Sequence, residues 1–369
     1  MDRLAQNFGK GCVSLGLCPS VEGDGKNWQF IGVWAKNRWE WTNTLLAGMH
    51  FRITGVGFYD AQSEEQVDYI IRQTEIATVT CTTDYANRLI EMKAKGMIPS
   101  LSNLVLMDTE DLTGFQTDMN LLTYTQVTDA GQRDTSITEF DPPTKDDVYM
   151  LSYTSGTTGD PKGVKFTHNM VLANSRTSIE RIHVTPGEAL ISYLPYTHSF
   201  EQALLGFALE TQCKVGFYTG DPTRIVSDCQ ALQPSFFPSV PRLYNKIYAS
   251  LQAGISNLTG CKRFLADYAL RTKITNYEYD GRVTHGCWDG IIFKKFREML
   301  GGKVRHMVTG SAPIEKQVID FLKVVFSCPI VEGYGLTETS AGGCVMEAED
   351  MIAGHVGGPI ETVKIRLRD

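Results

Sequence analysis

The sequence predicts an α/β protein in which helices flank largely parallel sheets. Along residues 28–107, short apolar runs alternate with stretches whose apolar residues recur every three to four positions. This alternation is typical of strand–helix–strand crossovers, which place neighbouring strands in parallel. With 369 residues, 42% hydrophobic and 21% charged, the chain has the composition of a globular protein and room for two or three lobes.

The first lobe is predicted to consist of four strands and the helices between them. The strands are expected at residues 28–33, 52–58, 76–81 and 103–107, and helices at 37–49 and 84–95. A further helix is expected to begin after Ser63, because Ser63 and Gln66 fit a capping box. Residues 109–146 are rich in Thr, Asp and Gln and are predicted to form a long connection before the stretch 153–164. The tentative lobes are 1–140 and 146–369.

The second lobe continues the alternation. Strands are predicted at 148–151, 189–194, 214–218, 303–308, 329–331 and 363–367, the last as an edge strand. Thr167 is a predicted N-cap, and helices are expected at 168–182, 242–251, 262–274, 293–300 and 314–325. The segment between the strand at 148–151 and Thr167 is therefore predicted to be a loop that joins a strand to a helix.

Charge and cysteine usage exclude several classes of protein. The net charge of −7 and the absence of a basic stripe argue against nucleic-acid binding. The nine cysteines include no C-x-x-C pair, which argues against zinc sites and disulfide frameworks and favours a reducing compartment. No apolar run approaches the roughly 18 residues that a membrane helix needs, and residues 1–20 do not have the pattern of a signal peptide.

The stretch Tyr153–Val164 carries the strongest functional signal. Its glycines allow close backbone approach, its hydroxyls and backbone N–H groups are donors to phosphate oxygens, and a lysine adds positive charge. The alternative is a flexible surface loop with a solvated lysine. The spacing fits neither a Walker A loop nor the dinucleotide-binding pattern. The candidate phosphate-binding residues are Thr154, Ser155, Gly156, Thr157, Thr158, Gly159 and Lys162.

Two further segments follow predicted strands, where α/β proteins place their ligands. The first contains the small residues Gly310, Ser311, Ala312 and Pro313, and the second contains Gly333, Tyr334, Gly335, Thr337 and Glu338. A tyrosine ring can stack on a purine, a threonine can donate to a phosphate, and a glutamate can bind Mg²⁺. Alone, the Gly-Tyr-Gly stretch would more often be a turn, and the first loop is what favours a binding role.

A single histidine, His198, is a candidate with an equally good structural explanation. It lies in Leu-Pro-Tyr-Thr-His-Ser-Phe-Glu, just where a helix could start, so a role in packing is as plausible as one in chemistry. No Gly-x-Ser-x-Gly motif supplies a serine nucleophile for it.

Together these motifs resemble those of the long-chain fatty acyl-CoA synthetases, which belong to the adenylate-forming, AMP-binding enzymes. The loop at 154–162 matches the AMP-binding signature, and the resemblance extends from residue 4 to residue 369. The stretches that favour the long-chain branch are 31–41, 240–244, 302–313, 332–338 and 354–357. The resemblance implies the large N-terminal domain of the adenylate-forming fold. It also implies ATP-dependent activation of a fatty acid to an acyl-adenylate, followed by transfer to coenzyme A.

The resemblance also assigns roles to the candidate residues. Thr154 to Lys162 would bind the β and γ phosphates, and residues 310–313 and 333–335 would line the adenine, with Tyr334 against its face. Thr337 would contact phosphate, Glu338 would bind Mg²⁺ with help from Thr154, and His198 would lie near the reacting carboxylate. The implied ligands are ATP, Mg²⁺, a fatty acid and coenzyme A as co-substrate, without nucleic acid.

The sequence departs from the family at both ends. The family continues beyond a strand like 363–367 into an aspartate-bearing motif, a hinge and a small C-terminal domain with a catalytic lysine. We therefore expect residues 1–369 to be an incomplete AMP-binding domain, a fragment inactive in acyl-CoA formation. Another acyl or aryl adenylate-forming ligase and a non-catalytic ATP- or adenylate-binding module stay open as alternatives. For the full-length protein, the resemblance suggests the cytoplasm or the cytosolic face of the endoplasmic reticulum or peroxisome, with peripheral membrane association.

Overall fold

The structure, a computed structural model, describes residues 1–138, 140, 142–154, 160–350 and 352–367. It divides the chain into two compact units. The first unit comprises Met1–Val171 with Pro195–Ser199, and the second comprises Leu172–Leu194 with Phe200–Asp369. The tentative lobes at 1–140 and 146–369 divide the chain at a different point. No described helix is long and apolar enough to cross a membrane.

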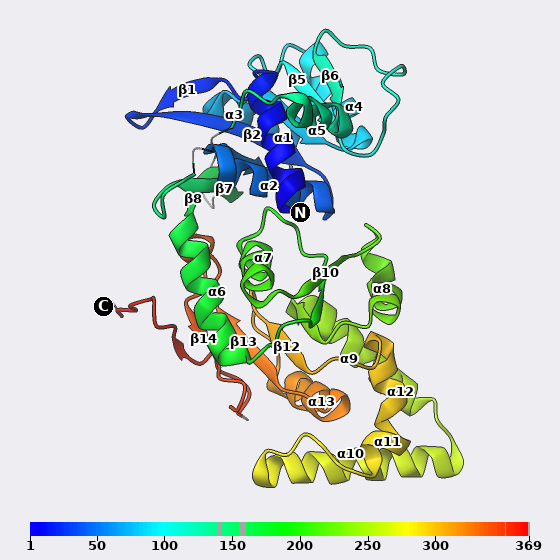
Figure 1. Ribbon diagram of the computed structural model, residues 1–369. Coiled ribbons are helices and arrows are strands. Elements are labelled where there is room, and N and C mark those ends of the chain that lie inside the picture. Colours follow the sequence, from blue (N-terminus) through cyan, green and yellow to red (C-terminus); the bar gives the residue numbers. More distant parts are fainter. Residues whose placement is uncertain (139, 141, 155–159, 351, 368–369) are drawn as a thin grey trace. The chain divides into compact units, whose positions relative to one another are not determined.

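The first unit contains a mostly parallel sheet with helices packed against it (Figure 1). Its strand order is β6 (Asn120–Thr123), β5 (Asn103–Leu106), β4 (Thr78–Cys81), β2 (Lys26–Trp34), β3 (Thr54–Gly57), β7 (Val148–Thr154) and β8 (Lys162–Thr167). Neighbours from β6 to β7 are parallel, whereas β8 is antiparallel to β7 and β1 (Ser20–Gly23) is antiparallel to β2. The helices are α1 (Asp2–Ser14), α2 (Trp39–Phe51), α3 (Glu64–Thr74), α4 (Thr83–Ala94) and α5 (Tyr124–Arg133).

The core of the first unit forms where the strands meet the apolar faces of α3 and α4. Val79 of β4 and Leu104 of β5 are fully buried in one cluster with Val67, Ile70 and Leu89 from the two helices. Each such side chain contributes about 1.5–3 kcal/mol by its removal from water. The predicted capping box of α3 is confirmed, because Ser63 and Gln66 each accept a hydrogen bond from the other's backbone N–H.

The second unit contains a second sheet with helices on both faces. Its strand order is β10 (Lys214–Phe217), β9 (Ala189–Ser192), β11 (Phe236–Ser239), β12 (His306–Thr309), β13 (Ile330–Tyr334), β14 (Cys344–Val345) and β15 (Gly358–Pro359). The ladder is parallel from β10 to β13 and antiparallel beyond it. The helices are α6 (His168–Ile182), whose first turn belongs to the first unit, α7 (Ser199–Thr211), α8 (Ile225–Leu232), α9 (Pro241–Ser256), α10 (Gly260–Asp280), α11 (Trp288–Ile291), α12 (Phe293–Arg297) and α13 (Lys316–Phe326).

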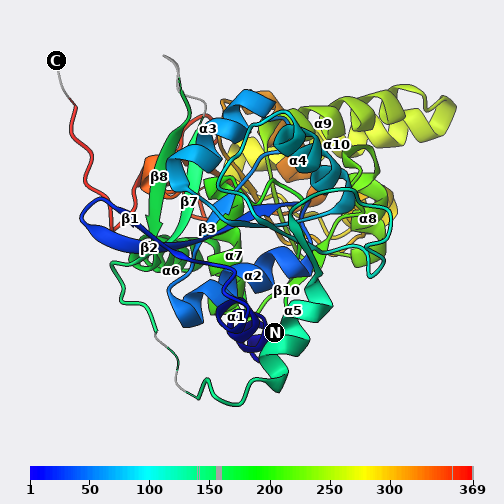
Figure 2. The same ribbon diagram turned by 90° about the horizontal axis from the view of Figure 1, so that it is seen from above.

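Two successive phenylalanines of β11 show how this sheet is covered on both faces. Phe236 packs on Phe207 of α7 with ring centroids 5.1 Å apart, and Phe237 packs on Tyr244 of α9 with ring centroids 5.9 Å apart. Because alternate strand residues point to opposite faces, the two contacts lie on opposite sides of the sheet. Figure 2 shows helices α7 and α9 from above. The predicted α/β architecture with largely parallel sheets is confirmed.

Three sequence predictions of local structure are wrong. First, residues 109–146 are not one long connection, because they contain β6 and α5. Thr123 and Gln126 form a second capping box at the start of α5, and Val127 is buried. Gly131 of α5 lies so close to α1 that a Cβ there would be 1.9 Å from the carbonyl oxygen of Asn7. The polar composition of this segment hid a helix whose stability comes from packing on α1.

The other two corrections concern strands. The glycine-rich loop joins two antiparallel strands, β7 and β8, and helix α6 begins only after β8. Residues 363–367 were predicted to be an edge strand, but they are irregular in the structure, and Leu367 is 93% exposed. Alternation of apolar and basic residues does not form a strand when no neighbouring strand pairs with it.

Candidate active site

The first unit holds the two ends of the predicted phosphate-binding loop. Thr154 is the last residue of β7, and it pairs in register with Lys162, the first residue of β8. The Thr154 hydroxyl donates to the Lys162 carbonyl at 3.5 Å, and the Lys162 side chain is exposed. The ends of the loop are therefore held one strand spacing apart. The remaining predicted residues of the loop lie outside the described residues: Ser155, Gly156, Thr157, Thr158 and Gly159.

The turn that carries His198 is fixed to the first sheet near the carboxyl end of β7, where the loop also begins. Ser152 of β7 donates its hydroxyl to the Thr197 carbonyl at 2.6 Å, and Thr42 of α2 donates to the Tyr196 hydroxyl at 2.8 Å. His198 is partly buried, and this burial lowers its pKa, so the imidazole is neutral at physiological pH. The first unit thus brings His198 and the start of the loop to the end of one strand, β7.

The second unit brings together the two segments predicted to line the adenine. Residues 310–313 follow β12, whereas Gly333 and Tyr334 are the last two residues of β13; the two strands are parallel neighbours with Thr309 in register with Glu332. A Cβ on Gly310 would be 3.1 Å from the Gly333 carbonyl oxygen, so the two backbones are close enough to favour glycine. Tyr334 is 50% exposed, which leaves its ring open to a ligand. The site therefore lies at the carboxyl ends of parallel strands, where open α/β sheets bind ligands.

The residues after Tyr334 form a short, well-supported turn. Thr337 and Glu338 lie in a single 3₁₀ turn, η3 (Thr337–Thr339), with Glu338 exposed. The Thr339 hydroxyl accepts a hydrogen bond from the Leu336 backbone N–H at 3.0 Å. Asn174 of α6 donates its side-chain amide to the Ser340 carbonyl and so holds the end of the turn.

The carboxylate of Glu338 fits a magnesium ion that is shared with phosphates. Among the described residues, no group of three or more His, Cys, Asp or Glu side chains could bind a metal ion. Mg²⁺ is commonly held by one or two carboxylates together with substrate phosphates and water, and needs no complete protein cage. The exposed carboxylate of Glu338, beside the candidate nucleotide site, suits that kind of binding.

Gly335 is expected to tolerate no side chain. A Cβ there would be 1.7 Å from the carbonyl oxygen of Ala341, so Gly335→Ala must displace the turn that carries Thr337 and Glu338. We expect at least about tenfold weaker ATP binding, worth about 1.4 kcal/mol, measured by equilibrium titration. The control is Gly358→Ala, where a Cβ would meet nothing within 4 Å. Equal affinities for the two variants would show that the turn does not shape the site.

A buried carboxyl group lies three residues after His198. Glu201 of α7 is 2% exposed, and its carboxyl group hydrogen-bonds the Ser192 hydroxyl at the end of β9. Burial raises the pKa of Glu201 to about 8, so the group is neutral at physiological pH in the folded chain.

Folding stability should therefore depend on pH through Glu201. Between its ordinary pKa of 4.5 and the folded value of about 8, the folded state keeps a proton that the unfolded state releases. The unfolding free energy should fall as pH rises through this window, by up to about 1.4 kcal/mol per pH unit. Urea unfolding at pH 5, 6.5 and 8 measures the free energy of unfolding. The value for the wild type should fall with rising pH relative to that of Glu201→Gln. Relative to the exposed control Glu180→Gln, which keeps Glu201, it should not change with pH. A difference from Glu201→Gln that does not change with pH would contradict the assignment.

The structure also shows supporting residues that the sequence did not reveal. Glu332 is buried, and its carboxylate accepts the backbone N–H of Gly354 at 3.0 Å, which ties residues 354–357 to the end of β13. Burial raises the pKa of Glu332. The Asn174 side-chain amide donates to the Ser340 carbonyl, although the two residues are 166 positions apart in the sequence. No local sequence pattern predicts a hydrogen bond over that separation.

Known proteins resemble this chain along most of its length. The family model described as AMP-binding enzyme matches residues 20–369. Long-chain-fatty-acid–CoA ligase 5 of Rattus norvegicus is 35% identical over 99% of this chain and 53% of its own length. Long-chain acyl-CoA synthetase 7, peroxisomal, of Arabidopsis thaliana is 33% identical over 92% of this chain and 48% of its own length. The chain spans about half the length of the curated relatives it matches.

Solved structures share the fold at lower sequence identity. The anthranilate CoA ligase AuaEII, in complex with anthranoyl-AMP, has a TM-score of 0.74 and 17% identity over the whole of this chain and 60% of its own. The adenylation domain of a carboxylate reductase from Mycobacterium chelonae has a TM-score of 0.71 and 18% identity over 91% of this chain and 50% of its own. These likenesses confirm the predicted fold, the N-terminal domain of adenylate-forming enzymes.

Proposed function

Because this chain belongs to the AMP-binding enzyme family, we propose that it provides the nucleotide-binding and acid-activating part of a long-chain fatty acid–CoA ligase. The carboxylate of the fatty acid attacks the α phosphorus of ATP, and the bond to pyrophosphate breaks to give an acyl-adenylate. The thiol of coenzyme A then attacks the acyl carbonyl and AMP leaves. The preference for a long-chain acid is supported by the names of the relatives at 33–35% identity.

One observation carries this proposal. Gly310 and Gly333 lie side by side at the carboxyl ends of β12 and β13, Tyr334 is exposed beside them, and the exposed carboxylate of Glu338 follows four residues after Tyr334. A flat ring can lie on the glycine backbones against Tyr334, and the phosphates then extend toward Thr337 and Glu338. This order of aromatic, hydroxyl and carboxylate groups corresponds to the order of groups along ATP–Mg²⁺.

The chemistry requires that the charge of two anions be offset. Bound Mg²⁺ would neutralise charge on the phosphates as pyrophosphate leaves. From the chain itself, Lys162 supplies a positive charge at the phosphate loop, and Thr337 supplies a hydroxyl donor. His198, neutral because of its burial, can donate a hydrogen bond to the fatty carboxylate without fixing it as a salt bridge, which would weaken the nucleophile.

ATP–pyrophosphate exchange with a panel of acids tests the proposal. Palmitate, octanoate, acetate and benzoate would be compared at equal concentration with the folded chain, ATP and Mg²⁺. We expect exchange to require an acid and to be fastest with palmitate. A product assay with coenzyme A, scored by mass spectrometry, then reports whether the chain completes the second step.

The other outcomes assign the chain differently. Exchange that is fastest with benzoate would indicate an aryl adenylate-forming ligase. ATP–Mg²⁺ binding without exchange with any acid would indicate a binding module. Absence of ATP binding by folded protein would contradict the site itself.

A further inference from the structure

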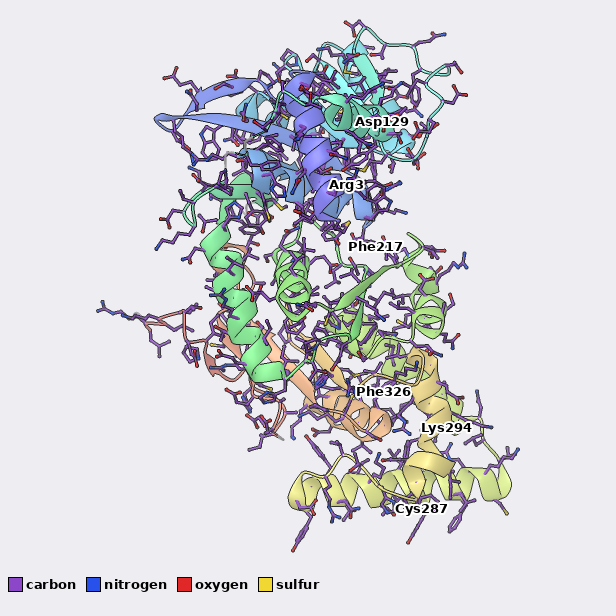
Figure 3. All side chains as sticks on the ribbon, viewed as in Figure 1. Arg3, Asp129, Phe217, Cys287, Lys294 and Phe326 are labelled. Carbon is purple, nitrogen blue, oxygen red and sulfur yellow. The ribbon has the colours of Figure 1, made fainter. Side chains whose placement is uncertain are left out.

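An exposed aromatic and basic surface lies on the second unit, on α10 and the short helices after it. We call this surface the α10 face. Its apolar members have large exposed fractions: 70% for Phe264, 54% for Tyr268, 86% for Tyr279 and 62% for Ile291. Figure 3, which labels Cys287 and Lys294, shows side chains projecting from the outer side of α10 and from α12. The basic members are Lys262, Arg271, Lys294 and Lys295, all exposed.

The members from α10 form a continuous stripe along the helix. Phe264, Tyr268, Arg271, Thr275 and Tyr279 are separated by four, three, four and four positions, so they lie on one side of the helix. The opposite side is buried against α9 and α13 through Ala266, Ala269, Lys273 and Tyr277. The helix therefore needs only one side for folding and directs its aromatic side to solvent.

The aromatic rings of the α10 face contact one another, and Trp288 joins them to the core of the second unit. The rings of Phe264 and Tyr268 are stacked at 6.3 Å, and Tyr268 meets the edge of Trp288 at 5.9 Å. Three aromatic side chains thus form a row across α10 and α11. Scattered exposed apolar residues need no explanation, but a contiguous row of large ones usually marks a binding surface.

The charge of this region is opposite to that of the whole chain. Residues 260–297 contain eight Lys and Arg and four Asp and Glu, a net charge of +4 in a chain of −7. Three of the four acids are neutralised locally, in the pairs Arg263–Asp267, Lys273–Asp289 and Arg282–Asp280. Glu278 is the remaining acid of the region. The four basic members of the α10 face form no ion pair with described residues, so their positive charges are not neutralised by those residues.

From this combination we propose that the α10 face docks on the surface of an anionic lipid bilayer. Tyrosine and tryptophan rings prefer the boundary between headgroups and acyl chains, and lysine and arginine side chains reach anionic headgroups from the same depth. An acidic chain with one basic aromatic face is attracted to such a surface in one orientation. The inference concerns where the protein works and does not rest on the proposed reaction.

Vesicle flotation tests the proposal with the whole chain. Vesicles of phosphatidylcholine alone are compared with vesicles that contain about 30% phosphatidylserine. We expect binding to the acidic vesicles only, and weaker binding as salt increases. Lys294→Glu with Lys295→Glu should weaken binding about tenfold or more, and Phe264→Ala with Tyr279→Ala should weaken it several-fold.

Matched double variants elsewhere serve as controls. Arg3→Glu with Lys145→Glu reverses the same number of exposed charges in the first unit. Leu209→Ala with Ile352→Ala removes two exposed apolar side chains of the second unit outside the face. Both controls should bind acidic vesicles like the wild type.

The exposed cysteines provide a second measurement. Cys261 and Cys287 are exposed and lie in the 260–297 region, whereas the other free cysteines are buried or partly buried. A thiol-reactive, polarity-sensitive dye should therefore report from this face and shift to the blue on acidic vesicles. Equal binding by the face variants and their controls would overturn the proposal. So would self-association in sedimentation that Phe264→Ala with Tyr279→Ala abolishes, because a second copy would then cover the face.

Discussion

Glu338→Gln is expected to lower ATP–pyrophosphate exchange by a factor of about 100 or more. The substitution keeps the size of the side chain but removes the negative charge that is proposed to hold Mg²⁺ against the phosphates. Loss of a correctly placed metal ion costs several kcal/mol of transition-state stabilisation, and each 1.4 kcal/mol corresponds to about tenfold in rate. Because Glu338 is exposed, folding should be unaffected.

Two comparisons make this prediction specific. Glu361→Gln removes another exposed carboxylate of the second unit and should leave exchange unchanged. Raising the Mg²⁺ concentration should restore part of the lost rate in Glu338→Gln, because a weakened metal site can be filled by mass action. Exchange at the wild-type rate in Glu338→Gln at limiting Mg²⁺ would refute the proposed role of this residue.

Lys273→Met is expected to destabilise the second unit by about 3–5 kcal/mol. The Lys273 side chain is fully buried, and its Nζ donates to the Asp289 carboxylate at 2.5 Å, to the Val324 carbonyl at 2.5 Å and to the Ser327 hydroxyl at 2.8 Å. Burial lowers the pKa of Lys273, and Asp289 opposes that shift. Methionine fills a similar volume but leaves the charge of the largely buried Asp289 without its cation, with the His285 backbone N–H still donating to it.

The control is the exposed pair on α13. Lys316 and Asp320 are 3.0 Å apart, with 59% and 24% of their side chains exposed, and a pair of this kind contributes only a few tenths of a kcal/mol. The free energies of unfolding of Lys273→Met and of the control Lys316→Met are measured in urea by tryptophan fluorescence. Trp288, which lies next to Asp289 in the sequence, provides a signal close to the buried network. A loss no larger for Lys273→Met than for Lys316→Met would show that the buried network does not stabilise the unit.

The parts of the fold that depend on neighbours in sequence could be predicted. The Ser63–Gln66 capping box and the alternation of strands and helices from 28 to 107 are local patterns, and both are present in the structure. The pairing of β8 with β7 depends on a reversal of chain direction that no local pattern marks, and the packing of α5 on α1 depends on segments distant in sequence. The local patterns predicted neither feature, and they also left α7, α8 and β11 without a prediction.

The candidate site divides in the same way. The glycine-rich segments at 310–313 and 333–335 were predicted from residue type and from their positions after strands, and the structure places them side by side. Their supports, Glu332 on Gly354 and Asn174 on Ser340, are single polar side chains that look like any others in the sequence. Only the fold identifies them, because only the fold brings their partners within hydrogen-bonding distance.

Photoaffinity labelling with 8-azido-ATP in the presence of Mg²⁺ tests the central claim most directly, because it reports which residues meet the adenine. The label should attach to peptides that contain residues 310–313 or Tyr334, and unlabelled ATP should prevent this. Gly335→Ala should reduce the labelling and Gly358→Ala should not. Labelling that ATP does not suppress, or that maps to other parts of the folded chain, would contradict the assignment of the nucleotide site.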